Sequence, residues 1–217
     1  DGAILVKAGP GSGKTRVLTE RVKNLLSKKR RGKVLALTFS NMAAEEMRTR
    51  LGNDPDVGDA IDRVTIGTIH SFCLDIIQSR GYLIGLHPDI SLFENENDRL
   101  AILRNVISDK TEFGMLLRRK DKPEEFIRNV LVAIADQKRN LISPELCSID
   151  EPFPTIYQRY NDVLKNQNAM DFDDILFFAY RILAENLDVT KLYNSIYRFV
   201  CIDEAQDLNY AQYRVIH

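Results

Sequence analysis

A glycine-rich segment near the start of the chain has the residue types and spacing that hold phosphate groups. Residues 8–15 fit the pattern of Ala or Gly, four variable residues, then Gly-Lys and Ser or Thr. Glycines let the backbone approach a ligand closely, and amides at the start of the following helix attract anions. The Lys14 ammonium would reach the β- and γ-phosphates of a nucleotide, and the Thr15 hydroxyl would bind Mg²⁺. A simple turn between a strand and a helix is the alternative without function. The candidate nucleotide-binding residues of this loop are Ala8, Gly9, Pro10, Gly11, Ser12, Gly13, Lys14 and Thr15.

Two acidic residues far along the chain supply the second half of this chemistry. Asp203 and Glu204 follow the apolar residues 199–202, which we expect to form a buried strand. A carboxylate at the end of such a strand holds Mg²⁺, directly or through water, and Asp203 fits this role. Glu204 would orient and deprotonate the water that attacks the γ-phosphate. An acidic turn after a strand is common by itself, but together with the phosphate loop it predicts hydrolysis of ATP.

Short apolar runs alternate with amphipathic helices around both motifs. The predicted strands are residues 4–6, 34–38, 64–68 and 199–202. Helices are predicted around residues 18–26, over about 41–51 and around 69–77, because apolar residues recur there at helical spacing. Strands that alternate with helices predict an α/β fold, with a parallel sheet flanked by helices.

The middle of the chain has a different pattern. From about residue 95 to 166 the sequence predicts helices and no strand, with prolines at the connections. We interpret this part as an all-helical subdomain inserted into the α/β domain. The predicted boundaries are 1–92 for the first part of the core domain, 93–167 for the helical subdomain and 168–217 for the second part. A further helix is predicted over residues 171–185, with Asp171 as its cap.

Composition limits the setting of the protein. The chain has 217 residues and a net charge of -1, so no global positive field points to nucleic acid, although local charge would be sufficient. Its three cysteines are widely spaced, which favours a reducing compartment. Without a signal peptide or a membrane-spanning run, we expect a cytoplasmic protein that has no membrane partner. The early phosphate loop and a last helix without a stop signal suggest a piece of a longer chain.

Five motifs in order resemble those of the UvrD/Rep/PcrA helicases of superfamily 1, over nearly the whole chain. Residues 8–16 resemble motif I, and residues 36–44 resemble motif Ia, with Glu46, Met47 and Arg50 in similar positions after it. Residues 67–72 (Gly-Thr-Ile-His-Ser-Phe) resemble the next DNA-facing motif. The Asp-Phe-Asp-Asp segment 171–174 matches a family signature, and residues 203–207 match the Asp-Glu-x-Gln-Asp form of motif II.

The resemblance implies a RecA-like domain interrupted by a helical subdomain. It also implies 3′-to-5′ translocation on single-stranded DNA and duplex unwinding, driven by ATP with Mg²⁺. Single-stranded DNA, DNA duplex junctions and the remaining helicase domains of the parent chain are the implied partners. By this resemblance Gln206 joins Lys14, Asp203 and Glu204 as a catalytic residue, and Arg16 contacts the nucleotide. The implied DNA track is formed by Thr38, Phe39, Asn41, Thr68 and His70.

Several of these residues also have an ordinary structural explanation. Phe39 at a strand end is more often a core residue, and His70 alone is more often a satisfied polar residue. The basic cluster 28–33 favours a solvated loop over a phosphate patch or a targeting signal. Residues 118–120 and the pair Lys138-Arg139, in the helical subdomain, are better candidates than this cluster for contacting duplex DNA.

Other functional classes also remain open. They are a nucleotide-dependent DNA-binding module, the helicase subunit of a recombination nuclease, and a phosphate-loop ATPase unrelated to DNA. The family's adenine-reading glutamine segment, motif III and second core domain are not in this sequence. We therefore expect this chain alone to bind ATP weakly and to hydrolyse it slowly, because arginines from a second domain accelerate such reactions.

Overall fold

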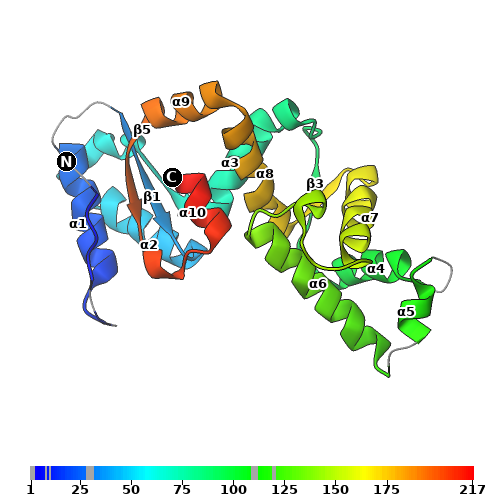
Figure 1. Ribbon diagram of the computed structural model, residues 1–217. Coiled ribbons are helices and arrows are strands. Elements are labelled where there is room, and N and C mark those ends of the chain that lie inside the picture. Colours follow the sequence, from blue (N-terminus) through cyan, green and yellow to red (C-terminus); the bar gives the residue numbers. More distant parts are fainter. Residues whose placement is uncertain (1–2, 8, 10, 28–31, 109–111, 119–120) are drawn as a thin grey trace. The chain divides into compact units, whose positions relative to one another are not determined.

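The computed structural model describes residues 3–7, 9, 11–27, 32–108, 112–118 and 121–217 (Figure 1). The chain divides into two compact units. Unit 1 comprises Asp1–Phe72 and Asn186–Leu208, and unit 2 comprises Cys73–Glu185 and Asn209–His217. The domain boundaries predicted from the sequence differ from those of the units and stay a prediction.

Unit 1 is built on a three-stranded parallel sheet with β1 in the centre. Its strands are β1 (Lys33–Thr38), β2 (Val64–Thr68) and β5 (Tyr197–Ile202). β1 is an apolar run that is buried along almost its whole length, as is typical of a parallel strand covered on both faces. Thr38 pairs with Thr68, and Leu37 pairs with Ile202, so the carboxyl ends of the three strands meet at one edge. This edge positions the candidate site.

The helices of unit 1 bury their apolar stripes against this sheet. They are α1 (Lys14–Ser27), α2 (Asn41–Gly52), the start of α3 (Ile69–Arg80) and α9 (Leu187–Ile196), with short 3₁₀ turns η1 (Gly58–Arg63) and η4 (Ala205–Asp207). Val22 and Leu26 of α1 pack with Met47 of α2 and Val34 of β1 in one core. The α/β fold class, with a parallel sheet flanked by helices, is therefore confirmed.

The strand predicted for residues 4–6 is wrong in this structure. No strand in the described part of the chain pairs with Ile4, Leu5 or Val6, which are 69%, 73% and 56% exposed. An apolar run identifies a segment that a sheet would bury, but it does not say whether a neighbouring strand is available for pairing.

Unit 2 is mainly helical, as predicted for the middle of the chain. Its helices are the rest of α3, α4 (Glu96–Val106), α5 (Gly114–Arg118), α6 (Pro123–Arg139), α7 (Phe153–Asn166), α8 (Phe172–Glu185) and α10 (Tyr210–Ile216), with 3₁₀ turns η2 (Gly81–Ile84) and η3 (Pro144–Leu146). A short parallel pair, β3 (Ser91–Phe93) and β4 (Ala169–Asp171), was not predicted. Leu103 of α4, Ile134 of α6 and Tyr160 of α7 are completely buried at the centre of this unit.

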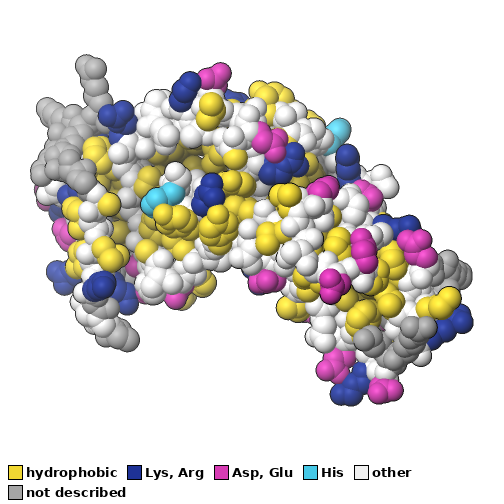
Figure 2. Space-filling model, viewed as in Figure 1, with side chains coloured by type: hydrophobic (Ala, Val, Ile, Leu, Met, Phe, Trp, Pro, Cys, Tyr) yellow, Lys and Arg dark blue, Asp and Glu magenta, His cyan; other side chains and the backbone are white. Residues whose placement is uncertain are grey.

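Basic and acidic side chains are interspersed on the face shown in Figure 2, in agreement with the small net charge. None of the helices in the part of the chain that the structure describes has the length and apolarity of a membrane span.

A buried charge network surrounds the Asp-Phe-Asp-Asp segment at the start of α8. The ammonium of Lys138 lies 2.7 Å from Oδ2 of Asp171 and 2.7 Å from Oδ1 of Asp174. The hydroxyl of Tyr160 donates to the same Asp171 oxygen at 3.0 Å. The Lys138 side chain is only 1% exposed, so its candidate role as a duplex contact is wrong. Its charge instead stabilises the buried side chains of Asp171 and Asp174.

The remaining acid of this segment is paired as well. Nε of Arg139 donates to Oδ1 of Asp173 at 2.7 Å, and Arg99 of α4 lies 3.7 Å from the other oxygen. The N–H of Asp171 also donates to Oδ2 of Asp174 at 3.0 Å, and the N–H of Asp174 donates to Oδ1 of Asp171 at 2.9 Å, which closes the first turn of α8. The predicted cap by Asp171 is thus confirmed, and the segment ties α8 to α4, α6 and α7.

One ammonium between two carboxylates cannot neutralise both of them. Burial and the neighbouring charge of Asp171 raise the pKa of Asp174 to about 7. Burial acts on Asp171 in the same direction, but the charge and hydrogen bond of Lys138 outweigh it and lower the pKa of that carboxyl. The pair therefore holds one proton across mildly acidic pH.

This proton makes stability depend on pH. Asp174 holds this proton in the folded chain up to about pH 7, whereas in the unfolded chain it loses the proton near its ordinary pKa of 3.8. Its contribution to the free energy of unfolding therefore falls as pH rises across that window. We expect Asp174→Asn to remove this loss, on the order of 1–2 kcal/mol between about pH 5 and pH 7.5. Urea unfolding followed by circular dichroism at both pH values measures it. Parallel pH profiles for the two proteins would contradict the assignment.

Candidate nucleotide-binding site

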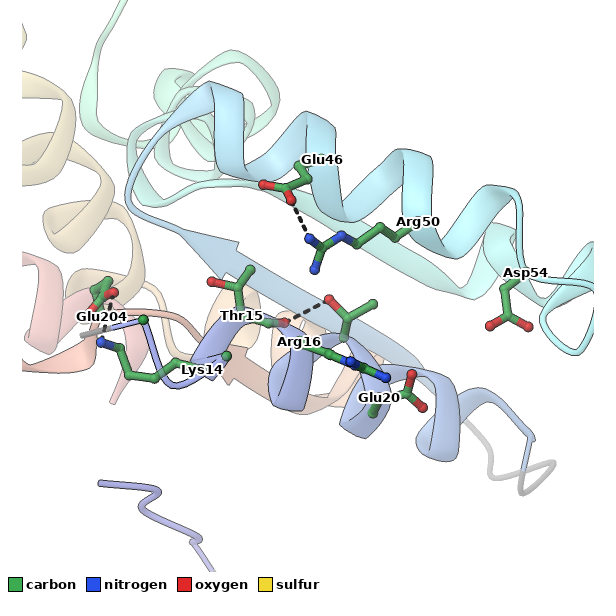
Figure 3. A pocket seen from close by; sticks show the side chains of 11 residues that line it. Lys14, Thr15, Arg16, Glu20, Glu46, Arg50, Asp54 and Glu204 are labelled. Atoms are coloured by element: carbon green, nitrogen blue, oxygen red, sulfur yellow. Dashed lines mark hydrogen bonds and ion pairs between the residues drawn. The ribbon is translucent and has the colours of Figure 1, made fainter. Parts of the chain in front are cut away.

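An open pocket of about 750 Å³ lies in unit 1, where the start of α1 approaches the end of β5 (Figure 3). It is the place where the two predicted halves of the site come together. The residues that line it are Gly11, Gly13, Lys14, Thr15, Arg16, Thr19, Glu20, Glu46, Arg50, Asp54 and Glu204.

Two glycines of the loop at the mouth of the pocket adopt a backbone conformation that other residues rarely adopt. Gly11 and Gly13 have φ angles of 72° and 84°, in the left-handed region that favours glycine. The hydroxyl of Ser12 donates to the carbonyl of Gly9 at 2.6 Å and closes the turn. A Cβ atom placed on Gly9 or Gly11 would meet nothing within 4 Å, so the loop borders open space. Ala8 and Pro10, also predicted to bind nucleotide, lie outside the described residues.

Two contacts join this loop to the acidic turn after β5. Oγ1 of Thr15 donates to Oδ2 of Asp203 at 2.9 Å, although the two residues are 188 positions apart. The ammonium of Lys14 lies 3.4 Å from Oε1 of Glu204, and the two side chains point toward each other in Figure 3. The backbone N–H of Asp203 donates to the carbonyl of Leu37 at 2.8 Å and so continues the pairing of β5 with β1. The pairing of β5 with β1 thus fixes the positions of Asp203 and Glu204.

Glu204 has an unusual backbone and a well-defined carboxylate. Its φ and ψ angles are 50° and 43°, a left-handed conformation that costs a non-glycine residue about 1–3 kcal/mol. Nε2 of Gln206 donates to Oε2 of Glu204 at 2.6 Å. The hydrogen bond from Gln206 and the charge of Lys14 lower the pKa of Glu204. At neutral pH the carboxylate is therefore ionised.

The residues at hand fit a magnesium ion that is shared with phosphate. Mg²⁺ is usually held by one or two protein oxygens together with water and substrate phosphates, and Thr15 and Asp203 place two such oxygens side by side. Among the described residues, the structure has no group of three or more His, Cys, Asp or Glu side chains that would form a complete metal site. The protein thus offers a partial site, which is the kind that a metal–nucleotide complex completes.

The far half of the pocket lies between α1 and α2. Glu46 and Arg50 of α2 form an ion pair, which Figure 3 shows above Arg16 and Glu20 of α1. Arg16 lines the pocket, and its predicted contact with the nucleotide stays a prediction. Glu20 was not singled out from the sequence, although its position four residues after Arg16 puts both on one face of α1.

Asp54 also lines the pocket, in the half between α1 and α2. Its Oδ2 accepts a hydrogen bond from Lys23 of α1 at 2.7 Å, which ties the loop after α2 to the phosphate-loop helix. Neither Lys23 nor Asp54 could be identified from the sequence, because their contact joins a helix to a loop 31 residues away.

The residues of the predicted DNA track follow the carboxyl ends of β1 and β2. Phe39 is 65% exposed, so its ring is not part of the core. Asn41 is exposed at the start of α2, and His70 is half-buried in the first turn of α3. Thr38 is buried and donates its hydroxyl to the carbonyl of Ser40 at 2.9 Å.

Thr68 is also engaged within the protein. Its hydroxyl accepts the backbone N–H of Ser71 at 3.1 Å, while its own N–H donates to the hydroxyl of Ser71 at 2.9 Å. Thr38 and Thr68 thus stabilise the strand ends, while Phe39 and Asn41 present exposed side chains at the same edge.

Comparison with known proteins places this site in a family context. Residues 1–217 match the family model of the UvrD/REP helicase N-terminal domain. The chain is 32% identical over 225 residues to the ATP-dependent DNA helicase PcrA of Bacillus subtilis (strain 168), an alignment that covers 100% of this chain and 29% of that protein. It is 31% identical over 223 residues to the ATP-dependent DNA helicase Rep of Buchnera aphidicola subsp. Baizongia pistaciae, covering 99% and 31%. The chain therefore spans less than a third of the length of these relatives.

Proposed function

This chain belongs to the UvrD/REP helicase family, and on that premise we propose that it is the ATP-binding N-terminal portion of an ATP-dependent DNA helicase. In the whole protein, ATP hydrolysis would drive 3′-to-5′ translocation on single-stranded DNA and duplex unwinding. The observation that carries the nucleotide part is the contact of Lys14 and Thr15 with the acidic turn at Asp203 and Glu204.

Each residue at this contact has a role in the proposed hydrolysis. Lys14 and the loop amides bind the phosphates and offset their negative charge. Thr15 and Asp203 would hold Mg²⁺, which would supply positive charge to offset that of the phosphate oxygens. Glu204 accepts a proton from the attacking water, and Gln206 keeps the Glu204 carboxylate in place through its hydrogen bond. Arg16 lies in the pocket beside the expected position of the nucleotide.

The DNA part of the proposal is supported by the exposed edge beside this pocket. An aromatic ring that is exposed at a strand end offers a stacking surface that every base fits, which suits a protein that moves along any sequence. Phe39 is that ring, with Asn41, Thr68 and His70 as neighbouring polar groups at the ends of β1 and β2. Because the net charge of the chain is only -1, DNA affinity would depend on such local contacts.

Replacing the lysine of the phosphate loop tests the nucleotide part. We expect Lys14→Ala to weaken binding of Mg·ADP about 10- to 100-fold, because a charge-assisted hydrogen bond to phosphate is lost. Isothermal titration calorimetry measures the affinity. Lys33→Ala is the matched control, since Lys33 is an exposed lysine at the opposite end of the sheet, where β1 begins. Equal affinities for wild type and Lys14→Ala would refute the assignment.

Replacing the exposed ring tests the DNA part. We expect Phe39→Ala to weaken binding of a fluorescent single-stranded oligonucleotide about 5- to 100-fold, because a stacked base contributes about 1–3 kcal/mol. Anisotropy titrations at two salt concentrations measure this effect together with the contribution of phosphate contacts.

The control for this measurement is Tyr82→Ala, which removes another aromatic side chain of similar exposure, 63% against 65%. It should leave DNA affinity unchanged. If both variants lose affinity equally, or if neither does, Phe39 is not a stacking platform.

A further inference from the structure

An exposed arginine of α10 is held between two tyrosines. Nη1 of Arg214 donates to the hydroxyl of Tyr210 at 2.8 Å, and Nη2 donates to the hydroxyl of Tyr180 on α8 at 3.1 Å. The Cζ atom of Arg214 lies 5.1 Å from the ring centre of Tyr180 and 5.7 Å from that of Tyr210. All three residues belong to unit 2. The hydrogen bonds and the cation–π contacts together hold the guanidinium in one position at the surface.

The rest of α10 makes this position a rigid one. Ala211 and Val215 are buried on the inner face of the helix. Its first turn is closed by a capping box, in which Asn209 and Gln212 each accept a backbone N–H group of the other. A side chain presented by such a helix meets a ligand with little loss of conformational entropy.

The positive charge of Arg214 lacks a counter-ion within the described part of the chain. The groups that contact it there are tyrosines, and no carboxylate forms an ion pair with it. A guanidinium has five N–H donors, of which these contacts use two. Because each tyrosine oxygen accepts from Arg214, its own O–H is left to donate to another group. The side chains therefore present donors only, which suits an anionic ligand.

A flat aromatic surface adjoins these donors. Tyr213 is 46% exposed, and its ring stacks on that of His217 with the centres 4.3 Å apart. Tyr210, one turn earlier on the same face of the helix, is 48% exposed. Figure 2 shows hydrophobic side chains gathered over α10 together with a histidine and a basic side chain. A nucleobase stacks on such rings while its phosphate meets the donors, whereas an acidic peptide would leave the rings unused.

We propose that this surface is a second contact for single-stranded DNA, which takes one phosphate group and an adjacent base. We call it the Arg214 cluster, and its members are Tyr180, Tyr210, Tyr213, Arg214 and His217. The cluster belongs to unit 2, whereas the predicted DNA track follows β1 and β2 of unit 1. The inference rests on the proposed DNA function and adds a second place at which the strand is held. Stacking makes this contact independent of base sequence.

Anisotropy titrations with a fluorescent oligothymidylate at several salt concentrations test the phosphate contact. We expect Arg214→Gln to weaken binding about three- to tenfold, because a charge-assisted hydrogen bond to phosphate is lost. The slope of log affinity against log salt should decrease by about 0.7, the value of one phosphate on a single strand.

Arg104→Gln is the matched control for this titration. It removes the same charge from a partly exposed arginine of unit 2 that Glu124 already neutralises at 2.7 Å. Affinity and salt slope should both stay at the wild-type values. Equal losses in the two variants, or no loss in Arg214→Gln, would overturn the proposal.

Photocrosslinking tests the base contact in the wild-type chain and so does not depend on how a variant folds. An oligothymidylate in which 5-iodouracil replaces thymine should crosslink to Tyr213 or Tyr210, because a base stacked on these rings lies against them. Mass spectrometry of the digested complex identifies the crosslinked residue. Crosslinks confined to Phe39 and its neighbours in unit 1 would contradict the second contact.

Comparison with Phe39→Ala separates this inference from the proposed function. A wild-type chain that binds no single-stranded DNA would overturn the proposed DNA function itself. Loss of affinity in Phe39→Ala with none in Arg214→Gln overturns the second contact alone. If Arg214→Gln instead loses binding of a fluorescent polyglutamate peptide and keeps its DNA affinity, the surface takes an acidic protein segment and the DNA assignment is wrong.

Discussion

The candidate site depends on one constraint, which is that the acidic turn after β5 stands beside the first turn of α1. The hydrogen bond from Thr15 to Asp203 spans 188 positions of sequence. It forms because β5 pairs in parallel with β1, and the ladder continues to the N–H of Asp203. Parallel strands bring their carboxyl ends to one edge, where ligands of open α/β sheets bind. The helical unit that intervenes in sequence therefore leaves the geometry of the site intact.

The two lysine–carboxylate clusters differ in burial, and therefore in how tightly each lysine is held. Lys138 is 1% exposed and lies 2.7 Å from two carboxylates, so breaking the cluster would leave a buried charge without a partner. Lys14 is 26% exposed and meets one carboxylate at 3.4 Å, so exchange for another anion is inexpensive. The same residue types thus fix the start of α8 in one place and offer an exchangeable contact in the other.

Sequence reasoning succeeded where a short segment carries its own signal. The phosphate loop, the strands β1, β2 and β5 and the cap by Asp171 all follow from local patterns. It failed where the structure of a segment, or the burial of a side chain, depends on residues far away in the sequence. Residues 4–6 look like a strand, but no strand among the described residues pairs with them. Lys138 looks like a surface cation, but it meets carboxylates 33 or more residues further along the chain. The β3–β4 pair was missed because a strand of three residues has no periodicity to detect.

We propose that Thr15 and Asp203 share a magnesium ion with a bound nucleotide. Titration of ADP with and without Mg²⁺, for wild type and Asp203→Asn, tests it most directly. We predict that Mg²⁺ strengthens ADP binding to wild type and that Asp203→Asn loses most of this gain, while its affinity for ADP without metal is kept or increased. An undiminished gain from Mg²⁺ in Asp203→Asn would contradict the account.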